Sequence, residues 1–144
     1  MSSPKNNALG YALKVAQLSL KNAMEDRLRA LELTISQYAV LTQLSLNPGQ
    51  TNAELARHAF MSAQSMQGVL ANMESTGLIV RTADKEHGRR QPASLTQAGS
   101  EALRLAREAV QPVENQLDLA VAPMNHADVL AVFQRIPIKL AELK

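Results

Sequence analysis

The sequence contains no cysteine and no tryptophan, and only two tyrosines and two phenylalanines occur among its 144 residues. Without cysteine, the chain can form no disulfide, no thiolate metal site and no thiol-based redox switch. The scarcity of aromatic side chains argues against proteins that stack the bases of single-stranded DNA or of RNA loops. The core must therefore be built from leucine, alanine, valine, isoleucine and methionine.

Long apolar runs are absent as well. No segment approaches the ~20 apolar residues that a membrane-spanning helix needs, and the N-terminus, MSSPKNNALGYALK, lacks the unbroken apolar stretch of a signal peptide. We therefore expect a soluble, cytoplasmic protein without a membrane partner. With 46% hydrophobic and 19% charged residues, the chain has the composition of one globular domain. The net charge of +2 is compatible with a nucleic-acid partner but does not by itself indicate one.

Catalytic patterns are also missing. The three histidines are scattered, and the sequence shows no metal-ligand spacing, no glycine-rich phosphate loop and no paired nucleophile and base. We therefore expect a protein that is not an enzyme and that holds no metal or cofactor.

The first segment with a helical period spans residues 8–29, where apolar side chains recur every three to four positions. Thr34 then begins a capping-box pattern, Thr-x-x-Gln, in which each end residue can bond the backbone amide of the other. This box predicts a second helix that covers residues 38–46 and ends before a Pro-Gly pair.

Two short helices are predicted next. A second capping box begins at Thr51 and predicts a third helix of about seven residues, 54–60. Ser62 predicts the start of a fourth helix over residues 62–75, and Gly77 supplies the left-handed position that often ends a helix. A link of about four residues between the two is helix-turn-helix spacing. Pairs of short helices also occur in ordinary bundles.

A β-hairpin is predicted directly after this helix pair. Residues 78–82 and 92–95 are short extended segments, and the polar residues 83–91 between them form a long loop. A hairpin in this place is typical of a wing, the loop that contacts DNA beside a helix-turn-helix. The alternative is an exposed β-loop with incidental charge.

Long helices flank this region on both sides. Thr96 caps a predicted helix over residues 97–121, in which Pro112 predicts a kink or a local break. A last helix is predicted over residues 127–143, and Pro137 is expected to bend or interrupt its final turns. The apolar surface of these helices and of the first one favours packing against a second copy of the chain, although a plain core helix is the alternative for the first.

These elements predict a mainly α fold with a small β-hairpin wing (α+β), a winged helix-turn-helix with flanking helices that form a dimerisation stalk. Residues 1–144 are expected to form one domain. Within it, residues 34–96 are the DNA-binding lobe, and residues 1–33 and 97–144 are the dimerisation helices.

In this architecture the fourth helix lies in the major groove of double-stranded DNA, and its first turns meet the base edges. Glutamine can pair with adenine through two hydrogen bonds, serine can donate or accept, and alanine can contact a thymine methyl group. Residues 62–75 contain no arginine or lysine, so we expect modest readout that leans towards A·T pairs. Each candidate could instead be an ordinary solvated position. The candidates are Ser62, Ala63, Gln64, Ser65 and Gln67.

Positive charge comes from the loop of the hairpin, which carries Lys85, Arg89 and Arg90. We expect Arg89 to enter a narrow minor groove, where the negative potential is strongest. A solvated charged loop is the alternative. Because so few charges are available, tight binding needs the contacts of a dimer. Further phosphate contacts are expected from Thr51, Asn52, Arg57 and Arg81.

These residues together resemble the MarR family of bacterial winged-helix regulators. The resemblance extends over nearly the whole chain and is carried by LTISQYAVLTQL, ELA, the Ser-led fourth helix that ends ESTGLIVR, the wing, and SLTQAG before a long helix. It implies a homodimer, held by the first, fifth and sixth helices, that binds a pseudo-palindromic operator and usually represses. It also implies control by a small, often phenolic or anionic, ligand, for which Tyr38 and His58 are candidate contacts. A core tyrosine and a surface histidine are the alternatives.

The sequence departs from the family pattern at two places. The wing of the family usually carries Asp-x-Arg, whereas His87-Gly88-Arg89 stands here, so the groove arginine keeps its place without its carboxylate partner. Gly68 occupies a position of the fourth helix where many members have a basic residue. Both departures lower the expected affinity for DNA. The alternative function is therefore a winged-helix protein-interaction module without strong operator binding.

Overall fold

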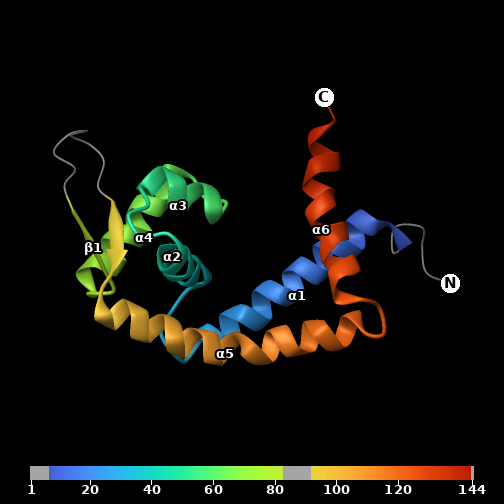
Figure 1. Cartoon of the computed structure of the whole chain (residues 1–144), viewed down its shortest axis with the longest axis horizontal. Coiled ribbons are helices and arrows are strands. Elements are labelled where there is room, and N and C mark those ends of the chain that lie inside the picture. Colours follow the sequence, from blue (N-terminus) through green and yellow to red (C-terminus); the bar gives the residue numbers. More distant parts are fainter. Residues whose placement is uncertain (1–6, 83–91, 144) are drawn as a thin grey trace. The chain divides into compact units, whose positions relative to one another are not determined.

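The computed structural model describes residues 7–82 and 92–143 (Figure 1). The chain divides into two compact units, residues 1–110 and 111–144, and the boundary between them falls within the fifth helix. Both predicted strands and all predicted helices are present. In order, the elements are α1 (Leu9–Arg29), α2 (Ile35–Leu46), α3 (Asn52–His58), α4 (Ala63–Ser75), β1 (Ile79–Arg81), β2 (Ala93–Leu95), α5 (Gln97–Val121) and α6 (His126–Ala141).

The core of the first unit lies between α2, α3, α4, the hairpin and the first turns of α5. Apolar side chains at helical spacing point inward from each helix, for example Met66, Leu70 and Met73 of α4. Each fully buried side chain of this size contributes about 1.5–3 kcal/mol through the hydrophobic effect. The largest buried side chains are Leu28, Val40, Leu41, Leu44, Leu55, Met66, Leu70, Met73 and Ile79. None of the described helices combines the length and the apolarity needed to cross a membrane.

Both predicted capping boxes form, but the helices begin earlier than expected. Thr34 Oγ1 accepts a hydrogen bond from the Gln37 amide at 3.1 Å, and Gln37 Oε1 accepts one from the Thr34 amide at 3.0 Å. Thr51 and Glu54 make the same reciprocal pair. The residues between the two ends of a capping box are already helical. The predicted starts of the second and third helices, at 38 and 54, are therefore wrong by two or three residues.

The end of α4 is the glycine-terminated helix end that the sequence predicts. Gly77 has a φ of +82°, the Leu78 amide donates to the Met73 carbonyl at 2.9 Å, and the Gly77 amide donates to the Glu74 carbonyl at 3.1 Å. This pair of bonds is the Schellman motif. It turns the chain directly into β1, so the hairpin begins at a fixed place beside α4.

A residue from outside the hairpin also pairs with β2, and the sequence does not reveal this contact. β1 and β2 are antiparallel, with Arg81 opposite Ala93 in the register. On its other side, Ala93 pairs with Gln50 from the segment before α3, through an Ala93 amide bond to the Gln50 carbonyl at 3.0 Å. The buried side chain of Gln50 also donates to the Gln43 and Asn47 carbonyls at 2.8 and 3.1 Å. The hairpin is therefore tied to the end of α2.

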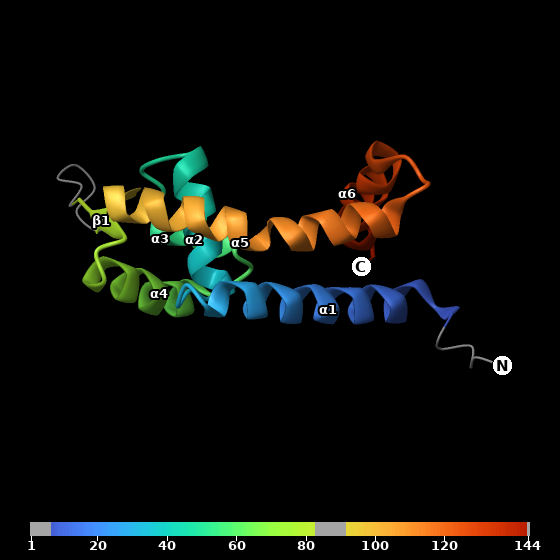
Figure 2. The same ribbon diagram turned by 90° about the horizontal axis from the view of Figure 1, so that it is seen from below.

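The helix α5 begins against the turn between α4 and β1 (Figure 2). Thr96 Oγ1 accepts a hydrogen bond from the Gly99 amide at 3.0 Å, as predicted for a cap, and it donates to the Gly77 carbonyl at 2.6 Å. A Cβ atom at position 99 would collide with the Leu78 carbonyl oxygen. Glycine at this position is therefore what allows the first turn of α5 to lie against the chain at Leu78.

The prolines do not break the last two helices. The helix α5 is continuous through Pro112, so the local break considered there is wrong, and α6 is continuous through Pro137. A proline inside a helix removes its own amide donor and crowds the carbonyl four residues earlier, but here the hydrogen bonds of the neighbouring turns keep each helix continuous. The helix α6 begins after Asn125, whose side chain accepts from the Ala127 amide at 2.8 Å.

Candidate nucleic-acid interface

The helices α3 and α4 are held together by one hydrogen bond and by shared core packing. The side chain of Asn52, at the start of α3, donates to the Ala63 carbonyl at the start of α4 at 3.0 Å. Leu55 and Ala56 of α3 are buried in the same cluster as Met66 of α4. The first turn of α4 is therefore fixed against α3, and its outer face keeps one orientation.

The outer face of α4 carries the predicted base-reading residues. Ser62 caps the helix, because its Oγ accepts from the Ser65 amide at 3.0 Å. Its hydroxyl also donates to Ser65 Oγ at 3.0 Å. The positive end of the helix dipole lies at this turn and favours an anionic group there. All five predicted residues are exposed: Ser62, Ala63, Gln64, Ser65 and Gln67.

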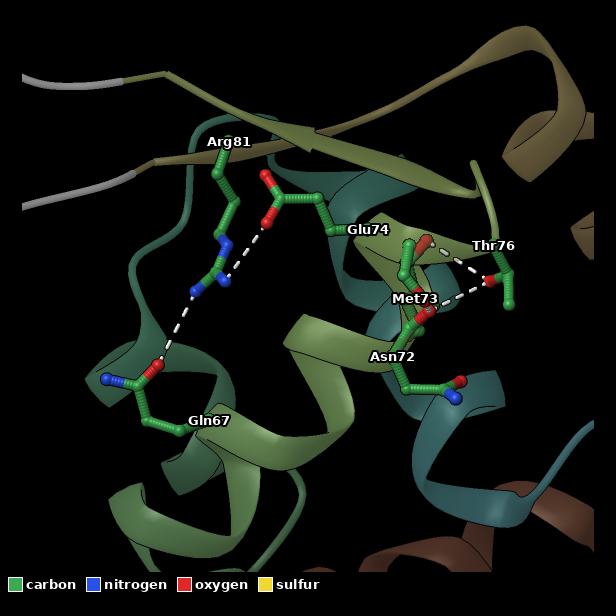
Figure 3. A network of polar contacts seen from close by, with 7 residues as sticks. Gln67, Asn72, Met73, Glu74, Thr76 and Arg81 are labelled. Atoms are coloured by element: carbon green, nitrogen blue, oxygen red, sulfur yellow. Dashed lines mark hydrogen bonds and ion pairs between the residues drawn. The ribbon is translucent and has the colours of Figure 1, made fainter.

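Arg81 of β1 does not project freely from the hairpin, as Figure 3 shows. Its Nη2 forms an ion pair with Glu74 Oε1 at 3.2 Å, and its Nη1 donates to Gln67 Oε1 at 3.4 Å. Only 13% of the Arg81 side chain is exposed, and its Nε is buried without a hydrogen-bond partner. The guanidinium group thus joins the hairpin to α4. A contact of Arg81 with phosphate stays a prediction, and it would require the group to leave these partners.

The other predicted phosphate contacts lie around α3. The hydroxyl group of Thr51 donates to Glu54 Oε1 at 2.8 Å and serves the capping box, while Arg57 is exposed on α3. Asn52 is half-buried and bonded to α4. These positions are compatible with contacts through the backbone at the start of α3 and through the side chain of Arg57. Lys85, Arg89 and Arg90 of the predicted wing tip lie outside the described residues.

The two predicted ligand contacts have different surroundings. Tyr38 of α2 is half-buried and packs against the core cluster, whereas His58 at the end of α3 is exposed. No hydrogen bond joins these two described side chains. Within residues 7–82 and 92–143, no group of three or more histidine, aspartate or glutamate side chains could hold a metal ion.

Two features of this region were not predicted from the sequence. Gln37 of α2 donates to Asn72 Oδ1 of α4 at 2.9 Å, which adds a polar contact between α2 and α4. Phe60, in the turn between α3 and α4, is 95% exposed and has a φ of +56°, a conformation that side-chain-bearing residues rarely adopt. Neither feature leaves a periodic signal in the sequence.

A short helix pair, a second helix with an exposed polar face and a hairpin directly after it define a winged helix-turn-helix, the class of protein that reads double-stranded DNA. A model of the MarR family matches residues 31–90 of this chain. The chain is also 36% identical over 106 residues to the HTH-type transcriptional repressor Rv2887 of Mycobacterium tuberculosis. The aligned residues cover 74% of this chain and 76% of that protein. The chain belongs to the MarR family and is a DNA-binding transcriptional regulator.

Solved structures agree with this assignment. The transcriptional repressor CouR bound to a 23-mer DNA duplex has a TM-score of 0.86 and 28% identity, covering 95% of this chain and 98% of that chain. The Mycobacterium tuberculosis MarR family protein Rv2887 in complex with salicylic acid has a TM-score of 0.66 and 32% identity. The match covers 92% of this chain and 96% of that chain. The predicted family and the predicted fold class are confirmed.

Proposed function

We propose that this protein is a homodimeric repressor that binds a pseudo-palindromic operator and leaves it when a small phenolic or anionic ligand binds. The observation that carries the DNA-binding part is the exposed polar face of α4, which Asn52, Gln37 and Arg81 hold against three different elements. A rigidly held helix loses little conformational freedom when it enters the major groove. The similarity to a repressor bound to DNA supports the same role.

Dimerisation is proposed from apolar side chains that this chain does not bury. In the first half of α1, Leu9 is 88% exposed. The helix α6 has no buried residue at all, and its Leu140 is 59% exposed. Exposed apolar side chains that recur along a helix are typical of an interaction site, and a second copy of the chain offers the same side chains. The exposed large hydrophobic residues of these helices are Leu9, Tyr11, Leu13, Val15, Leu18, Leu20, Leu130, Val132, Phe133, Ile138 and Leu140.

The charge of the interface explains why a dimer is needed. The helix α4 has no arginine or lysine, so each lobe can neutralise few phosphates. Two lobes on two half-sites about one helical turn apart, roughly 34 Å, would double that number. Sedimentation at micromolar concentration tests this part directly, and a monomer would contradict it.

Ligand control is proposed from the likeness to Rv2887, which forms a complex with salicylic acid, a phenol that also carries a carboxylate. Tyr38 and His58 remain the candidate contacts. Isothermal titration with salicylate measures binding, and Tyr38→Phe and His58→Ala test whether these side chains take part. Binding that is unchanged in both variants would remove them from the site.

Operator binding is tested by fluorescence anisotropy on duplexes selected from random sequence. We expect the affinity to fall as a power of the salt concentration, because bound phosphates release counterions. Arg89→Ala should weaken binding and leave the dimer intact. Arg107→Ala, at an exposed position of α5 outside the helix-turn-helix and the hairpin, is the matched control. The absence of salt-dependent binding would favour the alternative, a protein-interaction module.

A further inference from the structure

The contact between Arg81 and Gln67 fixes the orientation of a side-chain amide on the face of α4 that is proposed to read DNA. An arginine guanidinium has only donors, so the atom of Gln67 that faces it must be the acceptor, Oε1. The opposite orientation would place amide N–H groups against guanidinium N–H groups. Figure 3 accordingly shows the amide nitrogen of Gln67 directed away from Arg81.

Arg81 is itself held in place, so it acts as a fixed donor. Its guanidinium group is paired with Glu74 at 3.2 Å, and 13% of its side chain is exposed. Its backbone belongs to β1, where Arg81 lies opposite Ala93 in the hairpin register. The Nη1–Oε1 distance to Gln67 of 3.4 Å is long, but the position of the donor is set by these other contacts.

This arrangement changes which base Gln67 can read. The two-bond pair of glutamine with adenine uses the amide oxygen as the acceptor and the amide nitrogen as the donor. With its oxygen directed to Arg81, Gln67 presents two N–H donors. Guanine offers two adjacent acceptors in the major groove, O6 and N7, whereas adenine places an amino group beside its N7.

We propose that Arg81 is a positioning residue that makes Gln67 a reader of guanine. This inference rests on the proposed operator binding, and it replaces the expected adenine preference of Gln67. It also gives α4 a way to recognise guanine without an arginine or lysine of its own.

The test is selection of duplexes from random sequence by the full-length protein and by variants. We expect the wild type to prefer guanine by about tenfold at one position in each half-site. Gln67→Ala should lose the preference at that position and so identify it. Arg81→Met, which keeps the stem but removes the donors, should shift the preference there towards adenine and leave the other positions unchanged. Arg107→Met, once sedimentation shows that it keeps the oligomeric state of the wild type, is the matched control and should select the same sequences as the wild type.

The coupling between the two residues gives a second criterion. In a double-mutant cycle, Arg81→Met should have no effect on the choice between guanine and adenine once Gln67 is alanine. Arg81→Lys keeps a positive charge beside Glu74 but lacks the planar fork that reaches two acceptors. It therefore replaces Arg81→Met if thermal melting shows that the latter is not folded, and the same loss of guanine preference is expected.

The outcomes separate this inference from the proposed function. If the wild type enriches no sequence, operator binding fails and the inference fails with it. If the wild type selects an operator but the folded Arg81 variant keeps the same base at the Gln67 position, only the inference is overturned. A wild-type preference for adenine at that position would overturn it as well.

Discussion

Two glycines of the DNA-binding region should respond in opposite ways to the same substitution. Gly68 lies in the interior of α4, and Gly77 follows its end with a φ of +82°. At both positions, an added Cβ atom would meet nothing within 4 Å. The two sites therefore differ in backbone conformation and not in the space available, which isolates the conformational effect of a methyl group.

The expected magnitudes follow from the backbone. Alanine in a helix interior is more stable than glycine by about 1 kcal/mol, so Gly68→Ala should raise the free energy of unfolding by about that amount. The left-handed conformation costs an L-residue about 1–2 kcal/mol, so Gly77→Ala should lower it by roughly 1 kcal/mol. For a chain of this size, 1 kcal/mol corresponds to a change in Tm of about 3 °C.

Urea denaturation monitored by circular dichroism, at one protein concentration for all variants, measures both changes. Gly10→Ala is the control for Gly68→Ala, because Gly10 is also helical and an added Cβ there meets nothing within 4 Å. This variant should also stabilise the protein. A fall in stability for Gly68→Ala would refute the reasoning, since it would mean that residue 68 is not in a regular, unhindered helix. Unchanged stability for Gly77→Ala would refute the assigned helix end.

Three other predictions concern single contacts. Phe60→Gly should stabilise the protein by about 1 kcal/mol in urea denaturation, because it relieves a left-handed φ of +56° and gives up no burial at a side chain that is 95% exposed; a loss of stability would show that the aromatic ring makes a contact in solution. Gly99→Ala should cost several kcal/mol, on the order of the 2–5 kcal/mol of severe core substitutions, because its Cβ would collide with the Leu78 carbonyl oxygen; a melting curve like that of the wild type would contradict this close approach. On α5, the hydrogen bond from Arg104 lowers the pKa of Glu101, so Arg104→Ala should raise that pKa towards its ordinary value in an NMR titration, and an unmoved midpoint would mean that the pair does not form in solution.

Most helix ends and turns could be predicted from patterns within a few neighbouring residues. The capping boxes at Thr34 and Thr51, the serine cap at Ser62 and the glycine at 77 each satisfy backbone groups a few residues away, so a short stretch of sequence is enough to predict them. The predicted starts of the second and third helices are wrong because the residues inside a capping box already form the first helical turn. The continuity of α5 through Pro112 shows that one lost amide bond does not end a long helix.

What could not be predicted depends on contacts between distant parts of the chain. Gln50 joins the hairpin through a single residue pair, which leaves no strand-like pattern. The base-reading residues were predicted as independent side chains on one face of the fourth helix; they are exposed, and their role in DNA binding stays a prediction. The pairing of Arg81 with Glu74 and Gln67, however, requires β1 to lie beside α4, and residue spacing alone contains no such information.

The hydroxyl group of Thr96 and the bare backbone of Gly99 have a mechanical consequence. Through them, the first turn of α5 is bonded to the carbonyl of Gly77 and lies directly against Leu78, with no side chain between that could deform. A rotation of this turn would therefore displace the end of α4 and the start of β1 as one piece. We therefore expect these segments to move together, and a methyl group at position 99 would collide with the Leu78 carbonyl oxygen and separate them.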